Sequence, residues 1–347
     1  MTEIFSAIWE FIVLFVNENI PLIVGSIKAV IIAVGIMSVV PALVWLERRL
    51  MGRFQVRLGP NRVGPFGFGQ PMADTVKLLF KESIIQTSAD KFLFHLAPAV
   101  VVVTAIVGFA VIPFGEPFEV FGQNIELWGA NVNSGILFVF AISGMGIYGM
   151  VLAGLSSNNK YSLMGGLRSS AQMISYELTL GLSALSVIVL TGSLSLIDMV
   201  QAQESYPFIL VQPLAFLLFF IAGIAETNRA PFDLPEAEQE LVAGFHTEYT
   251  GMKFAMFFMG EYINMVTMSA LVTLLFLGGW NAYGLPIWPI VVFAGKVAFL
   301  LCVFIWLRST FPRIRYDRLM TFGWKVLLPL CLLNLMVTGA VKVILFP

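Results

Sequence analysis

Two long apolar runs, at about residues 207–227 and 253–278, are separated by the sequence Glu226-Thr-Asn-Arg-Ala-Pro-Phe-Asp-Leu-Pro-Glu-Ala-Glu-Gln-Glu-Leu-Val-Ala-Gly-Phe-His-Thr-Glu248. Charged residues make up only 12% of the chain, yet acidic side chains gather here around a single Arg229. They surround an Asn-Arg-Ala-Pro turn and a segment at 235–245 that favours a helix. Carboxylates in this setting need positive partners or protons, so we expect this segment to serve function rather than packing alone.

The whole chain is too apolar for a soluble domain. It has 347 residues, of which 58% are hydrophobic, and a mean hydropathy of +0.88. A helix needs about 20 mostly apolar residues to cross a bilayer. Eight runs meet this length, at about 20–46, 92–114, 134–155, 170–192, 207–227, 253–278, 287–309 and 323–345. We therefore predict an all-α, polytopic integral membrane protein with about eight transmembrane helices in a single transmembrane domain, and a short separate N-terminal helix at 4–16.

The basic residues predict the orientation of this bundle. All of the 20 Lys and Arg residues except Lys28, Lys296 and Lys342 lie in, or at the edges of, the segments that follow the first, third, fifth and seventh runs. The positive-inside rule places these segments, at about 47–91, 156–169, 228–252 and 308–325, on the inner side of the membrane. Both termini are then expected on the outer (periplasmic or intermembrane) side.

Few residues are suited to bind metals or nucleotides. Cys302 and Cys331 both lie inside apolar runs, and the chain has only two histidines, so we expect no metal site, iron–sulfur cluster or disulfide. The sequence Gly144-Met-Gly-Ile-Tyr-Gly149 has the spacing of a dinucleotide fingerprint, but it lies within an apolar run with no strand before it. Small residues that let membrane helices approach each other explain this spacing better.

Two glutamates, Glu177 and Glu261, lie inside apolar runs that both enter the membrane from the inner side. A carboxylate at such a depth is costly unless it is paired, hydrated or protonated. We expect both to carry protons, although a structural role through a bond to a neighbouring helix, for example by Tyr176 or Tyr262, is the alternative. Glu47 and Glu226 lie at the same face, and the four could form a file toward the middle of the membrane.

Two lysines, Lys28 and Lys296, also lie inside apolar runs, nearer the outer side. Each could face a carboxylate or a file of water in a proton path, or extend its ammonium toward the membrane surface. The sequence leaves both interpretations open.

The first inner segment combines arginines with aromatic residues on a backbone rich in Gly and Pro. Its charges could serve only to orient the chain and to bind anionic lipids. They could also line a cleft for an amphipathic ligand whose apolar tail lies in the membrane. The residues concerned are Arg48, Arg49, Arg53, Phe54, Arg57, Arg62, Phe66, Phe68, Asp74, Lys77 and Lys81.

Long motifs in three inner segments resemble one family. The first segment contains Glu47-Arg-Arg, Gln55-Val-Arg-Leu-Gly-Pro-Asn-Arg-Val-Gly-Pro65 and Gln70-Pro-Met-Ala-Asp-Thr-Val-Lys77. The second contains Asn158-Asn-Lys-Tyr-Ser-Leu-Met-Gly-Gly-Leu-Arg-Ser-Ser-Ala-Gln-Met-Ile-Ser-Tyr-Glu177, and the third is the acidic segment from Ala225 to Tyr249. Together they resemble the quinone-site membrane subunit of respiratory complex I, the NADH:quinone oxidoreductase of bacteria and mitochondria.

The resemblance implies an eight-helix subunit of a proton-translocating NADH:ubiquinone reductase, with ubiquinone as substrate and no redox centre of its own. It implies partners in the iron–sulfur and quinone-site subunits on the inner side, the small membrane-arm subunits and membrane lipids, with no nucleic acid. A bacterial plasma membrane is expected rather than a mitochondrial inner membrane. A homologous subunit of an energy-converting hydrogenase and a stand-alone ion transporter are the alternatives.

Two sets of residues are the expected site. The proton path and its coupling to quinone are assigned to Glu47, Glu177, Glu226, Asp233, Glu236, Glu238, Glu240, Glu248 and Glu261. The quinone chamber is assigned to Arg48, Phe54, Arg57, Arg62, Asp74 and Lys77.

Overall fold

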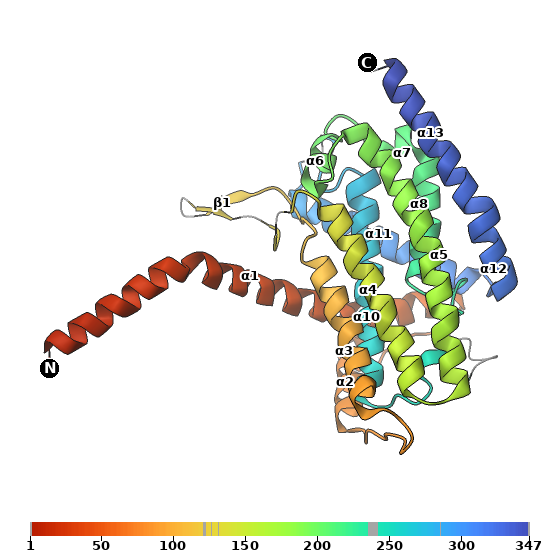
Figure 1. Ribbon diagram of the computed structural model, residues 1–347, viewed down its shortest axis with the longest axis horizontal. Coiled ribbons are helices and arrows are strands. Elements are labelled where there is room, and N and C mark those ends of the chain that lie inside the picture. The colour runs from red at the N-terminus through yellow and green to blue at the C-terminus, as the bar shows by residue number, and fades with distance from the viewer. Residues whose placement is uncertain are drawn as a thin grey trace.

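A bundle of helices forms most of the molecule in the computed structural model, which describes residues 2–120, 123–125, 127–130, 132–234, 242–284 and 286–345. Figure 1 shows the helices side by side, with the N-terminal part of the first helix projecting away from the others. We call the end of the bundle that carries residues 47–91 the inner end, following the orientation predicted from the basic residues. The helices are α1 (Thr2–Phe54), α2 (Gln70–Phe80), α3 (Lys91–Phe109), α4 (Gly135–Ser156), α5 (Lys160–Thr191), α6 (Leu196–Gln201), α7 (Phe208–Val211), α8 (Pro213–Glu226), α10 (Met252–Phe276), α11 (Pro289–Thr310), α12 (Tyr316–Phe322) and α13 (Leu328–Leu345).

Short elements complete the described chain. Two 3-10 turns lie at Pro65–Gly67 and Gly244–His246, and a π-helical turn, Gly323–Leu327, joins α12 to α13. The strands β1 (Phe118–Val120) and β2 (Gln123–Ile125) form an antiparallel hairpin between α3 and α4. The protein is therefore helical apart from this one small hairpin among the described residues.

Seven helical segments in the described part of the chain are long and apolar enough to cross a membrane. They correspond to seven of the eight predicted runs. The fifth run is divided at Gln212, whose backbone leaves the helical conformation just before Pro213, so α7 and α8 share it. Proline lacks the backbone N–H that a continuous helix would need at this point. The predicted separate helix at 4–16 is wrong, because these residues are the N-terminal part of the continuous α1.

Polar side chains begin two of the helices earlier than hydropathy indicates. The Asn159 carboxamide accepts a hydrogen bond from the backbone N–H of Tyr161, so α5 begins at Lys160 rather than near residue 170. Asp90 accepts from the N–H groups of Phe92 and Leu93 in the same way at the start of α3. Such side chains satisfy N–H groups that have no partner within the helix. Only residues 157–159 remain between α4 and α5, and Glu177 lies well inside a long helix.

The glycines of the 144–149 sequence serve helix packing, as predicted. A Cβ atom at Gly149 would lie 2.4 Å from a methyl carbon of Val101 on α3. A Cβ atom at Gly144 would lie 2.8 Å from the Oε1 atom of Glu177 on α5. Residues without side chains therefore let α4 approach both neighbours, and α10 lies deepest, with 83% of its most apolar window buried.

Lys296 and Lys342 bind the outer ends of two helices. The Lys296 ammonium donates to the carbonyl oxygens of Leu277, Gly279 and Asn281, at 2.8, 2.9 and 2.9 Å, where α10 ends. The Lys342 ammonium donates to the carbonyls of Val189 and Leu190 near the end of α5. The structure thus gives Lys296 carbonyl partners at a helix terminus instead of a carboxylate.

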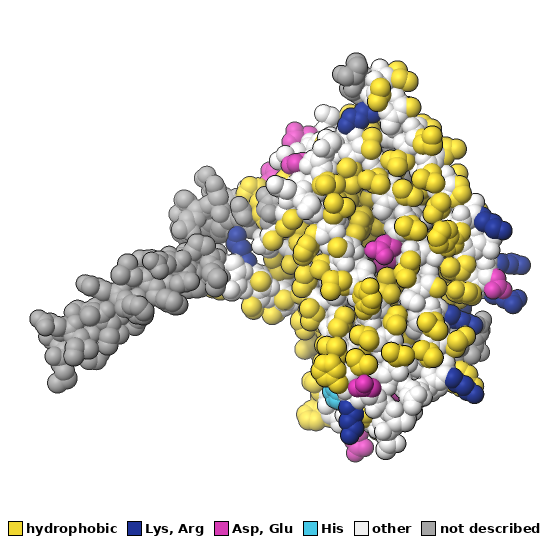
Figure 2. Space-filling view, viewed as in Figure 1, with side chains coloured by type: hydrophobic (Ala, Val, Ile, Leu, Met, Phe, Trp, Pro, Cys, Tyr) yellow, Lys and Arg dark blue, Asp and Glu magenta, His cyan; other side chains and the backbone are white. Residues whose placement is uncertain are grey.

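Hydrophobic side chains cover the flank of the bundle seen in Figure 2, and most of the charged side chains in that view lie toward its ends and right-hand edge. This distribution suits a protein whose middle contacts lipid and whose ends contact water.

Candidate functional site

Glu47 lies at the centre of a buried polar cluster at the inner end of the bundle. Its side chain is only 5% exposed, although it lies on a helix that is otherwise largely exposed. Its Oε2 atom accepts a hydrogen bond of 2.7 Å from the Tyr262 hydroxyl, and its Oε1 atom accepts from the Arg308 guanidinium. These contacts join α1, α10 and α11 through one carboxylate.

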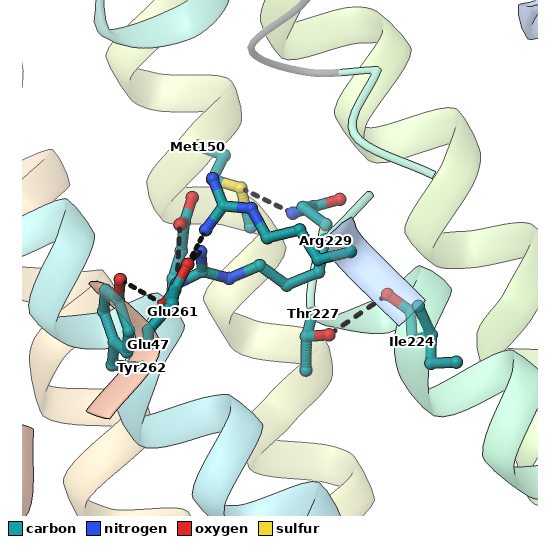
Figure 3. A network of polar contacts seen from close by, with 9 residues as sticks. Glu47, Met150, Ile224, Thr227, Arg229, Glu261 and Tyr262 are labelled. Atoms are coloured by element: carbon teal, nitrogen blue, oxygen red, sulfur yellow. Dashed lines mark hydrogen bonds and ion pairs between the residues drawn. The ribbon is translucent and has the colours of Figure 1, made fainter. Parts of the chain in front are cut away.

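Arg229 is the second centre of the cluster, and it lies in the acidic segment that follows α8. Its guanidinium lies 3.8 Å from a carboxylate oxygen of Glu47 and 4.0 Å from one of Glu261, and its carbon is 4.3 Å from the centroid of the Tyr262 ring. Figure 3 shows these side chains converging from separate elements. Burial alone would lower the pKa of Arg229, but Tyr262, Glu47 and Glu261 together raise it above its ordinary value, so the guanidinium stays charged. One buried cation therefore serves two buried carboxylates.

Glu226 lies beside this cluster without a direct partner. Both of its carboxylate oxygens are buried and have no hydrogen-bond partner among the described residues. They face a cavity of about 10 Å³ that Glu261 and Asn264 also line, which is about the space of one water molecule. Unpaired buried carboxylates are costly, so this position favours a proton or a water molecule on Glu226.

Glu177 approaches the same region from α5. Its carboxylate lies against Gly144 of α4, near the middle of that helix, and its charge acts on Glu226. The structure thus brings together the four glutamates that the sequence predicts as a file, Glu47 and Glu261 directly through Arg229, and Glu177 through its proximity to Glu226.

The expected tyrosine partners of the glutamates are different. Tyr262 donates to Glu47 rather than to Glu261, and the Tyr176 hydroxyl donates to the carbonyl oxygen of Leu319. Each ring reaches across to another helix, and hydropathy carries no information about that direction.

Two acids of the third inner segment bind other inner segments. Asp233 forms an ion pair of 3.1 Å with Arg313, which lies between α11 and α12. Glu248 accepts a hydrogen bond of 2.7 Å from Asn159 at the start of α5. Glu236, Glu238 and Glu240 lie outside the described residues, as does most of the predicted 235–245 helix. The described acids therefore tie the inner segments to one another.

The adjacent Tyr249 anchors this segment in a second apolar core. Its ring stacks on Phe94 at 4.0 Å, and its hydroxyl shares a hydrogen bond of 3.1 Å with Ser156. Burial raises the pKa of Tyr249 to about 12, although Ser156 lowers it in part. Tyr249 thus remains neutral near pH 7 and serves as an anchor.

The first inner segment folds back on α1. Arg48 forms an ion pair of 2.6 Å with Asp74 of α2. Arg49 donates to the carbonyl oxygen of Phe66, and its guanidinium lies over the rings of Trp45 and Phe66. These contacts hold α2 and the Gly/Pro-rich turn close to the helix that carries Glu47.

A cavity of about 230 Å³ opens in this segment, lined by Arg49, Arg53, Arg57, Leu58, Gly59, Pro60, Asn61 and Phe66. Of the residues assigned to the quinone chamber, only Arg57 lines this cavity, where its Nε atom donates to Gln55. Phe54, Arg62 and Lys77 are exposed, whereas Asp74 is half-buried beside Arg48. The cavity has the mixed cationic and apolar lining expected for the polar end of an amphipathic ligand.

Three residues of the cluster, Arg229, Tyr262 and Arg308, are absent from the site predicted from the sequence. Arg229 is the only cation within a strongly acidic segment, and Arg308 ends an apolar run at the inner side. Both are places where a positive charge can reach a buried carboxylate, and this signal could have identified them.

The cluster is suited to proton and charge movement. Carboxylates that share one fixed cation and one hydroxyl exchange protons according to small changes in local charge. Its position next to the cavity of the first inner segment lets a charge change there act on Glu47.

Comparisons with known proteins agree on one family. The family model described as NADH dehydrogenase matches residues 27–339. A membrane subunit of the NADH-quinone oxidoreductase of Syntrophobacter fumaroxidans is 54% identical over 90% of this chain and 94% of its own length. The corresponding subunit of Geobacter metallireducens is 52% identical over 90% and 94%, and that of Rhizobium meliloti is 49% identical over 90% and 95%. With most of its length matched in this way, the chain belongs to the NADH dehydrogenase family.

Proposed function

We propose that this chain is the quinone-site membrane subunit of a proton-translocating NADH-quinone oxidoreductase. In that complex it forms part of the quinone entrance and connects quinone reduction to a proton path. The names of the relatives support the overall activity, and they give no support to a hydrogenase subunit or a stand-alone transporter. The single observation that supports the coupling role is the buried Glu47–Arg229–Glu261 cluster beside the first inner segment.

The proposed chemistry follows from charge. Reduction of a quinone to a quinol takes up two electrons and two protons, and electron arrival creates negative charge before the protons follow. The electrons come from partner subunits on the inner side. A negative charge near Arg48 and Arg57 weakens the hold of nearby cations on Glu47, which then gains a proton more readily.

Proton movement would continue through the neighbouring carboxylates. Glu47 and Glu261 share Arg229, so a proton on one strengthens the pairing of Arg229 with the other. Glu226, which lacks a direct partner among the described groups, is suited to receive the proton through the small cavity that it shares with Glu261. Glu177 extends this path toward the middle of the membrane.

Partners and location follow from the same proposal. The exposed inner segments would contact the iron–sulfur and quinone-site subunits, and the apolar flanks would contact small membrane-arm subunits and lipids. The three relatives are bacterial, which favours the bacterial plasma membrane and ubiquinone or a related quinone as substrate.

The test replaces Glu47 by glutamine in the assembled complex. Glu47→Gln keeps the size of the side chain but removes the titrating proton and the full charge. We expect NADH:quinone activity to fall by more than about tenfold, a change of about 1.4 kcal/mol in the barrier. NADH oxidation by ferricyanide, which bypasses the membrane subunit, should stay near the wild-type rate.

The matched control is Glu204→Gln, because Glu204 is exposed and lies on the outer side in the predicted orientation. It should leave both activities unchanged. An equal loss of both activities in an assembled Glu47→Gln complex, or no loss of either, would refute the coupling role.

A further inference from the structure

A large apolar cavity lies between α1 and α11, away from the carboxylate cluster. Its volume is about 640 Å³, and α3 and α10 also contribute to its walls. Its lining includes Ile36, Phe109, Val266, Phe293 and Leu301. Lys28, at one end of it, precedes Glu47 by 19 residues on α1, which is about 28 Å along a helix. The cavity therefore belongs to the outer half of the bundle and not to the proposed quinone entrance.

Two polar groups in this apolar lining lack acceptors. Lys28 is the only charged residue that lines the cavity, and within the described structure its ammonium has no hydrogen-bond or ion-pair partner. Trp128 also lines the cavity and is 8% exposed, and its buried indole N–H has no acceptor among the same residues. A buried donor without an acceptor is costly, as is a cation within an apolar membrane region. Both donors are suited to an anionic or oxygen-rich ligand group.

We propose that this cavity binds one anionic phospholipid of the outer leaflet. An acyl chain occupies the apolar part, toward Ile36 and Leu301, while phosphate or ester oxygens accept hydrogen bonds from Lys28 and Trp128. A phospholipid combines an apolar chain and an anionic head in one molecule, and the cavity combines the matching surfaces. Basic groups between membrane helices bind lipid headgroups in this manner.

The other occupants fit less well. A transmembrane helix of a neighbouring subunit would have to place an anion or a carbonyl acceptor beside Lys28, and such groups are rare on lipid-facing helices. A quinone offers an apolar tail but no negative charge for Lys28. The labelling experiment described next distinguishes both from a lipid.

Glycines provide a matched pair of variants on α1. A Cβ atom added at Gly35, which lines the cavity, or at Gly25, which does not, would meet no atom within 4 Å. Gly35→Leu should therefore fill the cavity without displacing the protein, and Gly25→Leu adds the same side chain to the same helix elsewhere. Ala294→Leu fills the cavity from α11 and serves as a second, independent variant.

The experiment uses the assembled complex in phosphatidylcholine vesicles that contain phosphatidylglycerol with a photoreactive acyl chain. After illumination, labelled peptides are mapped by mass spectrometry. The wild type and Gly25→Leu should be labelled at the cavity-facing parts of α1 and α11, and Gly35→Leu and Ala294→Leu should lose most of this labelling. Lys28→Gln should reduce the preference for phosphatidylglycerol over a phosphatidylcholine probe about fivefold, which corresponds to about 1 kcal/mol for one lysine near an anionic lipid.

Three results would overturn the proposal. The first is equal labelling of the wild type and both filled variants, which would mean that lipid never enters the cavity. The second is loss of labelling when excess ubiquinone is added, which would identify a quinone site. The third is no labelling of the wild-type complex, which would indicate that a neighbouring subunit covers the cavity.

Discussion

At the scale of single residues, Arg229 has the largest electrostatic role in the described site. It is 5% exposed and faces Glu47 and Glu261, so its removal leaves two buried carboxylates with less compensation. Breaking a buried ion pair by removing one partner costs about 3–5 kcal/mol. We expect Arg229→Met to lower the thermal stability of the subunit within the complex by several degrees and to abolish quinone-linked activity, whereas Arg229→Lys should retain part of both.

The control for this prediction is Arg315→Met. Arg315 pairs with Asp317, but both side chains are more than two-thirds exposed, and such pairs contribute less than about 1 kcal/mol. Similar melting temperatures for the Arg229→Met and Arg315→Met complexes would contradict the assigned role.

Gly144 allows a second prediction, which concerns the position of Glu177. Gly144→Ala would place a methyl group 2.8 Å from the carboxylate oxygen and force Glu177 to move. We expect proton pumping per NADH oxidised to fall in proteoliposomes, as it should for Glu177→Gln, while Glu177→Asp keeps part of it. Gly181→Ala is the control, because a Cβ atom there meets nothing within 4 Å. If Gly144→Ala and Glu177→Gln both pump normally, Glu177 has a structural role only.

At the scale of elements, Lys296 and Lys342 compensate the carbonyl ends of α10 and α5. The last carbonyl groups of a helix have no partner within it and carry partial negative charge. In water these groups would be solvated, but near the membrane the lysines supply the donors instead. This explains how two lysines inside apolar runs are tolerated without a carboxylate partner among the described residues.

This arrangement predicts the effect of removing one of them. Lys296→Met would leave three carbonyl groups without their donor, at a cost of about 1–3 kcal/mol for each group that water does not reach. We expect a lower melting temperature of the purified complex with little change in quinone-linked activity at a permissive temperature. Lys77→Met, an exposed position on α2, provides the comparison. A selective loss of pumping in Lys296→Met with unchanged stability would instead indicate a proton path.

At the scale of the whole molecule, the sequence predicts the helices well and their side-chain partners poorly. Each membrane helix satisfies its own backbone and needs only apolar length, so local hydropathy is sufficient to find it. Glu47 and Arg308 are 261 residues apart, and their contact depends on how α1 and α11 pack. The four glutamates could be predicted because depth in an apolar run is itself a local signal, whereas their cation and hydroxyl partners depend on tertiary structure. Asn159 and Gln212 set helix boundaries through single side-chain or backbone features that hydropathy averages away.

The orientation of the chain remains a prediction at this scale. Eight crossings and the distribution of basic residues place both termini on the outer side. Alkaline phosphatase fused after Pro347 should be active in a bacterial host, because this enzyme folds only outside the cytoplasm. Green fluorescent protein fused at the same point should be dark when exported through the general secretion route. The reverse pair of signals would invert the assigned inner and outer ends.

The position of Glu177 beside Gly144, the tenth residue of the 22-residue α4, gives this carboxylate an electrical property. A group midway through a membrane lies about halfway along the voltage drop. Moving one elementary charge across a full 100 mV costs about 2.3 kcal/mol, and thus about 1.2 kcal/mol for half of it. A proton that leaves a negative interior must climb this part of the field, so its occupancy of Glu177 falls about sevenfold for each 100 mV. Glu177 would thereby report the voltage of the membrane to the carboxylates below it, and loading of the path would slow as the membrane becomes charged.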